Sequence, residues 1–237
     1  HEDVDGKGSA VNTEDHERDI NLICEMGATM IRLSHYPQSQ YFYDLADQRG
    51  MVLWSEIPFC GPGGYDFTGY VKNVEENARQ VALEMIYQNI NHPSVCFWGI
   101  FNEILVDDGR FKAYDNPVKF VNDLNKLFKK TDPSRLTSFA TCVDHTHYQG
   151  CSDLIAWNKY FRKPGNEAGV RKFYEQARQT ANSQPLGISE YGDAGSIKIH
   201  YDPRYDRVRD HAENYQLQTH EGYWRAIKDS EWLWCKR

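Results

Sequence analysis

Short apolar runs alternate with longer, periodic segments along most of the chain. The runs are rich in β-branched and aromatic residues, which is typical of strands buried on both faces. Six of them begin near residues 28, 51, 94, 136, 154 and 185. Between them, apolar residues recur at helical spacing over about residues 13–26, 40–48, 73–89, 117–130, 167–181 and 211–228. This regular alternation predicts an α/β fold with a parallel sheet.

The start of the first helix is marked by Thr13, which is followed by the acidic residues Glu14 and Asp15. Threonine is a common N-cap, and acidic side chains favour the first turn of a helix. We therefore predict that Thr13 caps this helix and that Gly27 ends it.

Polar and aromatic side chains gather where the predicted strands end and not where they begin. A doubly wound sheet would concentrate such groups at one switch point, whereas a closed barrel collects them from many strands. The pattern favours a single TIM (β/α)8 barrel domain over residues 1–237. The residues at these strand ends are His35, Glu56, Asn102, Glu103, Tyr160 and Glu190.

Two of these strand ends carry a glutamate, far apart in the sequence. The run 94–101 leads into Asn102 and Glu103, and the run 185–189 leads into Glu190. A carboxylate at a buried strand end costs free energy unless it is hydrogen-bonded, so it indicates either a structural salt bridge or chemistry. A pair of carboxyl groups aimed at one sugar is what glycoside hydrolysis needs.

Composition excludes several classes of partner. The chain has 237 residues, a net charge of -7 and a pI near 5.7, which argues against nucleic acid and anionic membranes as partners. No apolar run approaches the length of a membrane span. Aromatic residues make up 14% of the chain and serve either as core or as platforms for a sugar ring.

The six cysteines show no metal-ligand spacing. Cys24 and Cys96 lie in apolar segments and are predicted to be buried thiols, which favours a reducing compartment over a disulfide scaffold. His145 and His147 could form half of a metal site, but no third ligand stands at suitable spacing, so we interpret them as exposed loop histidines. The segment 187–191 resembles a G-x-S-x-G nucleophile elbow, but Tyr191 replaces the second glycine.

Five short motifs together resemble glycoside hydrolase family 2, which contains the β-galactosidases and β-glucuronidases. They occur in the order found in that family, and the resemblance covers essentially the whole chain. The motifs are His1-Glu-Asp3, Leu33-Ser-His-Tyr-Pro37, Asn91-His-Pro-Ser-Val95, Asn102-Glu103 and Ser189-Glu-Tyr191.

The resemblance implies a role for each candidate site residue. Glu103 would be the general acid/base and Glu190 the catalytic nucleophile of a retaining mechanism. Asn102 would donate to the 2-OH of the sugar, Tyr160 would hydrogen-bond the nucleophile, and His35 would line the sugar subsite. The resemblance also suggests three residues for substrate contact: Asp3, Glu56, which could instead form an ion pair at the barrel rim, and Trp234. No metal or other cofactor is expected.

The activity expected first is hydrolysis of terminal β-galactosides. A β-glucuronidase and a non-catalytic carbohydrate-binding or assembly fragment stay open as alternatives. The loop after Phe161 carries Arg162 and Lys163 where family members commonly have Gly-Trp-Tyr, and this gives some weight to an anionic sugar. Strands one and eight of the family's barrel would lie outside the chain. The expected partners are therefore a carbohydrate, the remaining domains of a parent chain and, as an open alternative, further copies of the chain.

Overall fold

The computed structural model describes residues 4, 6–61, 71–104, 117–161, 166–200 and 211–233, and the side chains of residues 71 and 72 are not described. The chain divides into two compact units. The first comprises residues up to 143 together with 147–154. The second comprises residues 144–146 and the chain from residue 155 to residue 236.

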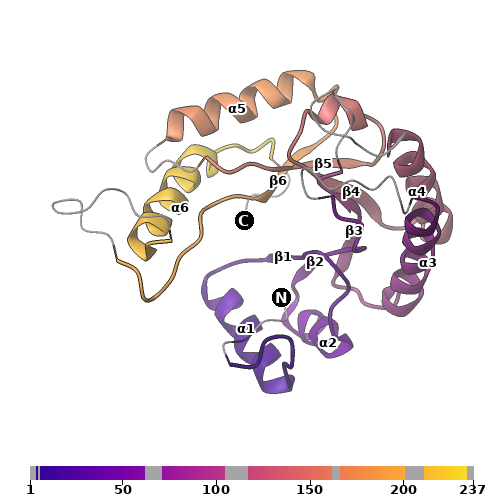
Figure 1. The fold of residues 1–237 in the computed structure, drawn as a ribbon, viewed down its shortest axis with the longest axis horizontal. Helices are drawn as coiled ribbons and strands as arrows, with labels where there is room; N and C mark the ends of the chain where they lie inside the picture. The colour runs from indigo at the N-terminus through magenta and orange to yellow at the C-terminus, as the bar shows by residue number, and fades with distance from the viewer. Residues whose placement is uncertain are drawn as a thin grey trace. The chain divides into compact units, whose positions relative to one another are not determined.

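The first unit is built on parallel strands that follow one another in chain order, each preceded by a helix (Figure 1). Helices α1 and α2 pack against each other, as do α3 and α4. The strands are β1 (Met30–Leu33), β2 (Val52–Glu56), β3 (Val95–Asn102) and β4 (Leu136–Thr141); the helices are α1 (Thr13–Glu25), α2 (Gln40–Arg49), α3 (Val71–Asn89) and α4 (Pro117–Thr131).

The second unit repeats the same pattern. Strand β5 (Leu154–Asn158) is followed by α5 (Glu167–Thr180), β6 (Leu186–Glu190) and α6 (Glu213–Ile227). Strands β5 and β6 pair in parallel, and helices α5 and α6 pack together. A short 3-10 helix, η1 (His145–Tyr148), lies in the connection between β4 and β5.

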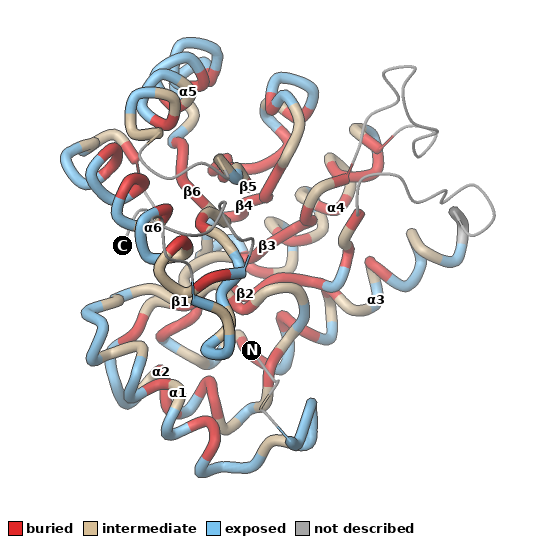
Figure 2. Tube along the Cα trace, turned by 60° about the vertical axis from the view of Figure 1, so that its left-hand side comes forward, coloured by how far each residue is buried: buried red, intermediate tan, exposed pale blue. Residues whose placement is uncertain are grey.

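All six predicted strands and all six predicted helices are confirmed, with ends that move by a few residues. The strands are mostly buried, whereas the helices alternate buried and exposed positions (Figure 2). Burial on both faces is the reason that the strands appear in the sequence as continuous apolar runs. Among the described residues, no helix is long and apolar enough to cross a membrane.

The prediction for the first helix cap was wrong by one position. Asn12 is the N-cap of α1, and its side chain accepts a hydrogen bond from the backbone N–H of Asp15 at 3.1 Å. The Asp15 carboxylate accepts in return from the Asn12 backbone N–H at 3.0 Å, which completes a capping box. Thr13 is instead the first helical residue, because the asparagine before it supplies the better-placed acceptor.

Three burial predictions were also wrong. Cys24 and Cys96 are half-buried, although both thiols are free. His145 is 1% exposed and packs edge-on against Trp157 with the ring centroids 5.5 Å apart, whereas His147 is exposed as predicted. Periodicity could not show that η1 turns one of the two histidines inward.

The core of the first unit contains a stacked aromatic cluster. The rings of Phe101 on β3 and Phe139 on β4 stack with centroids 4.8 Å apart, and Tyr148 packs against both. The Tyr148 hydroxyl donates to the Ile104 carbonyl at 2.8 Å. This contact fixes the backbone directly after Glu103, so the core positions the segment that holds the candidate acid/base.

Candidate active site

A buried carboxylate lies at the end of β2. The Glu56 side chain is 1% exposed and receives the Arg32 guanidinium on both oxygens: Arg32 Nε donates to Oε2 at 2.8 Å and Nη2 donates to Oε1 at 3.1 Å. The Nδ1 atom of His35 donates to the same Oε1 at 2.7 Å. Glu56 therefore forms the ion pair that was one of its two predicted roles.

Arg32 connects this ion pair to the next strand. Its Nη2 atom also donates to the Asn102 side-chain oxygen at 2.8 Å, and its guanidinium lies 4.8 Å from the centre of the Trp54 ring. Arg32 was not among the residues predicted for the site. A charged residue inside the apolar run 30–33 was the signal that could have found it, because a buried arginine needs a partner.

The backbone of Asn102 is fixed as well as its side chain. Its N–H donates to the Phe59 carbonyl at 3.0 Å, and its carbonyl accepts from the Gly61 N–H at 2.8 Å. The β3–β4 pairing shifts register between Gly99 and Asn102. Such irregularities re-aim side chains at strand ends, and this one lies directly before Asn102 and Glu103.

Glu103 has a backbone conformation that is rare for a residue with a side chain. Its φ is 53°, in the left-handed region, and its N–H donates to the Ala140 carbonyl at 2.9 Å. Non-glycine residues in this region cost free energy and persist where the surrounding structure imposes them. The half-buried side chain of Glu103 is therefore aimed by a strained backbone at the end of β3.

His35 stays cationic over a wide range of pH. Hydrogen bonds with the Cys60 thiol and then with the Glu56 carboxylate raise the pKa of His35 to about 10, against the effect of burial. The imidazolium and the Arg32 guanidinium thus share one buried carboxylate. Cys60 was not among the residues predicted for the site.

In the second unit, Glu190 ends β6 and accepts a hydrogen bond from the Tyr160 hydroxyl on its Oε2 atom. This is the contact expected between the tyrosine and the proposed nucleophile. The Glu190 carbonyl accepts from the Lys159 N–H at 3.0 Å, so the end of β6 is paired beside Tyr160. Next to it, the Ser189 hydroxyl donates to the Asn158 side-chain oxygen at 2.6 Å.

Aromatic side chains support these strand ends of the second unit. The Tyr223 hydroxyl on α6 donates to the Lys159 carbonyl and accepts from the Phe161 N–H at 2.8 Å. The Tyr191 ring lies 4.9 Å from the Tyr223 ring. Burial raises the pKa of both phenols, which keeps them neutral. Helix α6 therefore fixes the strand ends that carry Tyr160 and Glu190.

The structure does not describe the other residues that were predicted for the site. Asp3 and Trp234 lie outside the described residues, as do Arg162 and Lys163.

Within the part of the chain that the structure describes, the one cluster with metal-ligand spacing is Asp44, Asp47 and His92.

A structural role accounts for that cluster. The Asp47 carboxylate already accepts from His92 Nδ1 at 2.7 Å and from the Ser94 N–H at 2.9 Å. These hydrogen bonds attach helix α2 to the segment that leads into β3.

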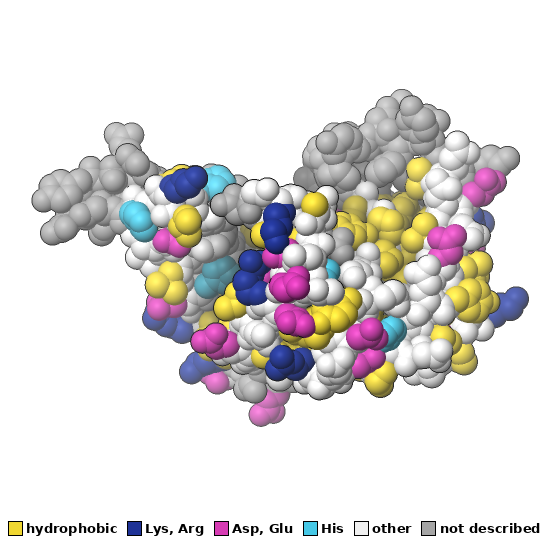
Figure 3. Space-filling view, turned by 90° about the horizontal axis from the view of Figure 1, so that it is seen from below, with side chains coloured by type: hydrophobic (Ala, Val, Ile, Leu, Met, Phe, Trp, Pro, Cys, Tyr) yellow, Lys and Arg dark blue, Asp and Glu magenta, His cyan; other side chains and the backbone are white. Residues whose placement is uncertain are grey.

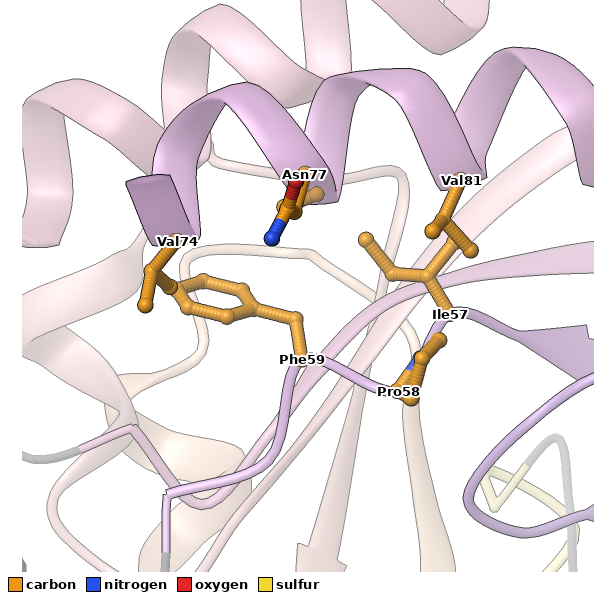
Figure 4. A pocket seen from close by; sticks show the side chains of 7 residues that line it. Ile57, Pro58, Phe59, Val74, Asn77 and Val81 are labelled. Atoms are coloured by element: carbon orange, nitrogen blue, oxygen red, sulfur yellow. The ribbon is translucent and has the colours of Figure 1, made fainter. Parts of the chain in front are cut away.

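A cavity of about 220 Å³ lies between α3 and the segment after β2 (Figure 4). Its lining is apolar except for the amide of Asn77, so it offers no carboxylate for sugar chemistry. The lining residues are Ile57, Pro58, Phe59, Val74, Asn77, Ala78 and Val81. On the face shown in Figure 3, acidic and basic side chains are interspersed.

The comparison with known families identifies the protein family of this chain. Residues 1–231 match the family model described as "Glycosyl hydrolases family 2, TIM barrel domain". The chain belongs to glycoside hydrolase family 2. Its six parallel strands are accordingly strands of a family 2 TIM barrel, as the sequence predicted.

Individual relatives of this family 2 barrel carry two names. A β-glucuronidase of Bacteroides fragilis is 39% identical over 240 residues, which cover 99% of this chain and 34% of that protein. A β-galactosidase of Thermoanaerobacterium thermosulfurigenes is 28% identical, over 78% of this chain and 23% of that protein. The crystal structure of a Bacteroides uniformis β-glucuronidase superposes with a TM-score of 0.83 at 30% identity, over 99% of this chain and 29% of that one.

The chain therefore spans about a third or less of the length of these relatives.

Proposed function

We propose that this barrel carries out the hydrolysis of terminal β-glucuronides, by a retaining double displacement on two carboxyl groups. Glu190 attacks the anomeric carbon and forms a glycosyl-enzyme bond, while Glu103 protonates the departing glycosidic oxygen. Glu103 then removes a proton from the water that hydrolyses the intermediate, and Glu190 leaves as a carboxylate.

The local contacts support these roles. The hydrogen bond from Tyr160 fixes the position of the Glu190 carboxylate, as a nucleophile requires. Glu103 follows Asn102, whose amide is oriented by Arg32, and Asn102 is the proposed donor to the sugar 2-OH. The proposed mechanism also requires that the carboxyl groups of Glu103 and Glu190 lie about 5–5.5 Å apart in the active enzyme, as in other retaining glycosidases.

The glucuronide is preferred over the galactoside that the sequence analysis put first. The observation that carries this choice is the 39% identity to a β-glucuronidase over 99% of the chain. Most of the other named relatives carry the same name, at lower identity. β-Galactosidase is the second candidate, because a relative of that name matches at 28% identity.

The test is a comparison of substrates with the parent-length protein. We expect kcat/KM for p-nitrophenyl β-glucuronide to exceed that for p-nitrophenyl β-galactoside by at least about a hundredfold. A site that binds the carboxylate group of the sugar rejects a sugar that lacks this group. The Glu190→Ala variant measures the background. A preference for the galactoside would restore the first expectation, and cleavage of neither glycoside would favour the non-catalytic alternative.

A further inference from the structure

The buried carboxylate of Glu56 has no access to a substrate, yet it is the centre of the hydrogen-bond network on the first unit's strand ends. Its side chain is 1% exposed, and the Arg32 side chain that it binds is 9% exposed. An ion pair of this kind contributes little net stability, because desolvation of both charges offsets their attraction. Its place in this network therefore needs an explanation other than stability.

The contacts of Arg32 supply that explanation. Two of its nitrogens are held by Glu56, and one of these, Nη2, also donates to Asn102 Oδ1 at 2.8 Å. A guanidinium can only donate, so it selects the orientation of the Asn102 amide in which the oxygen faces Arg32. The amide N–H groups then point away from Arg32.

The same carboxylate also orients the histidine. His35 Nδ1 donates to Glu56 Oε1 at 2.7 Å, which fixes the plane of the imidazole ring. Strands β1 and β2 and the loop after β1 are thus joined through one side chain. A glutamine at this position has the same shape, but its NH2 group would face donors of Arg32 or His35.

We propose that Glu56 is a positioning residue for the reaction proposed above. Acting through Arg32, it sets the amide of Asn102 to donate to the sugar 2-OH. Hydrogen bonds to the 2-OH strengthen in the transition states of retaining glycosidases, so the orientation of this amide affects the rate. The inference rests on the proposed function.

The experiment uses the parent-length enzyme and two aryl β-glucuronides, one with the 2-OH and one 2-deoxy analogue. In Glu56→Gln, we expect kcat/KM for the 2-hydroxy substrate to fall by about tenfold to a hundredfold, the range for losing a hydrogen bond within a charged network. The 2-deoxy substrate should change by less than about threefold, because it has no hydroxyl for Asn102 to bind.

Two further variants place the effect on Asn102. Asn102→Ala should give the same selective loss, and Glu56→Gln combined with Asn102→Ala should be no slower than Asn102→Ala alone.

Arg32→Lys keeps the charge but loses the two-nitrogen fork, so it should also lose activity selectively on the 2-hydroxy substrate. If Glu56→Gln does not fold, the ratio between the two substrates in Arg32→Lys tests the inference instead.

The matched control is Asp132→Asn, which removes another buried carboxylate that is paired with an arginine in the same unit. It should reduce stability and leave the ratio between the two substrates unchanged. An equal loss on both substrates in Glu56→Gln and Arg32→Lys would overturn the inference and leave the proposed function standing. If the unaltered enzyme cleaves neither glucuronide, the proposed function fails, and this inference fails with it.

Discussion

At the scale of single residues, the two proposed catalytic glutamates are held in different ways. Glu103 is aimed by its backbone, which has a φ of 53° and donates to Ala140. Glu190 is held through its side chain by the hydroxyl of Tyr160. The strained backbone fixes where the Glu103 side chain begins, and the phenol donor fixes where the Glu190 carboxylate lies.

Replacement of Glu190 by alanine should abolish turnover in the parent-length enzyme. Added azide should then restore cleavage of an activated aryl glycoside, because the small anion can occupy the space of the missing carboxylate. The product should be the glycosyl azide of inverted anomeric configuration, identified by NMR. Wild-type activity in the alanine variant would show that another residue is the nucleophile.

Glu103→Gln should discriminate between substrates by their leaving groups. Loss of the proton donor should slow natural glycosides by about a hundredfold or more, whereas aryl glycosides with acidic phenols should lose far less in the glycosylation step. Pre-steady-state measurement of phenol release isolates that step. Equal losses on both kinds of substrate would contradict the acid/base assignment.

At the scale of secondary-structure elements, the site depends on a close approach of β2 and β3. Glu56 pairs with Gly99 in the register of these strands. A Cβ atom at Gly99 would lie 2.2 Å from the Glu56 Cβ and 2.6 Å from Nε1 of Trp54. Glycine is therefore required at this position by packing rather than by backbone conformation.

Gly99→Ala should thus displace Glu56 and reduce both stability and activity. Overpacking of this kind costs about 1–3 kcal/mol, measurable by urea unfolding, and kcat/KM should fall as in Glu56→Gln. Gly27→Ala is the matched control: its φ is 83°, but no atom lies within 4 Å of the added Cβ. It should lose stability and keep kcat/KM, and a similar loss of activity there would refute the link through Glu56.

At the scale of the whole molecule, a second buried ion pair connects elements of the first unit. Asp132 accepts from Arg135 Nη1 at 2.8 Å and from the Trp98 indole N–H at 2.9 Å. Arg135 donates in turn to the carbonyls of Ile90 and Val95 at 2.8 Å and 2.6 Å. The turn after α4 is thereby tied to both ends of the segment that joins α3 to β3.

This pair predicts a pH dependence of stability. Burial alone would raise the pKa of Asp132, but hydrogen bonds from Ser134, Arg135 and Trp98 outweigh it and lower the pKa to about 2 from 3.8 in the unfolded chain. Relative to its protonated form, the ionised carboxylate therefore stabilises the fold by about 2 kcal/mol above pH 4, and this difference is lost as the pH falls toward about 2.

Asp132→Asn should accordingly lower the free energy of unfolding at neutral pH. The difference from the unaltered protein should narrow as the pH falls from about 5 to about 3, because the Asp132 carboxyl of the unfolded chain takes up a proton there, whereas the folded one, with a pKa of about 2, stays ionised. Urea unfolding of both proteins over this range measures it. A difference that is constant with pH would mean that shape, and not charge, accounts for the loss.

The sequence by itself determined the elements and their chemistry. The apolar runs located the six strands, because a strand buried on both faces leaves a continuous hydrophobic signal of its own. The strand ends gave Glu103 and Glu190, because a polar residue directly after such a run is visible without knowing its neighbours. Both are local properties of the chain.

The tertiary structure alone decided which side chains meet. Arg32, Glu56 and Asn102 lie on three different strands, and their contacts depend on the parallel register and on its shifts beside β3. Register in a sheet buried on both faces is set by packing between distant segments, so no local pattern encodes it. For the same reason the sequence could neither single out Arg32 nor choose between the two roles of Glu56.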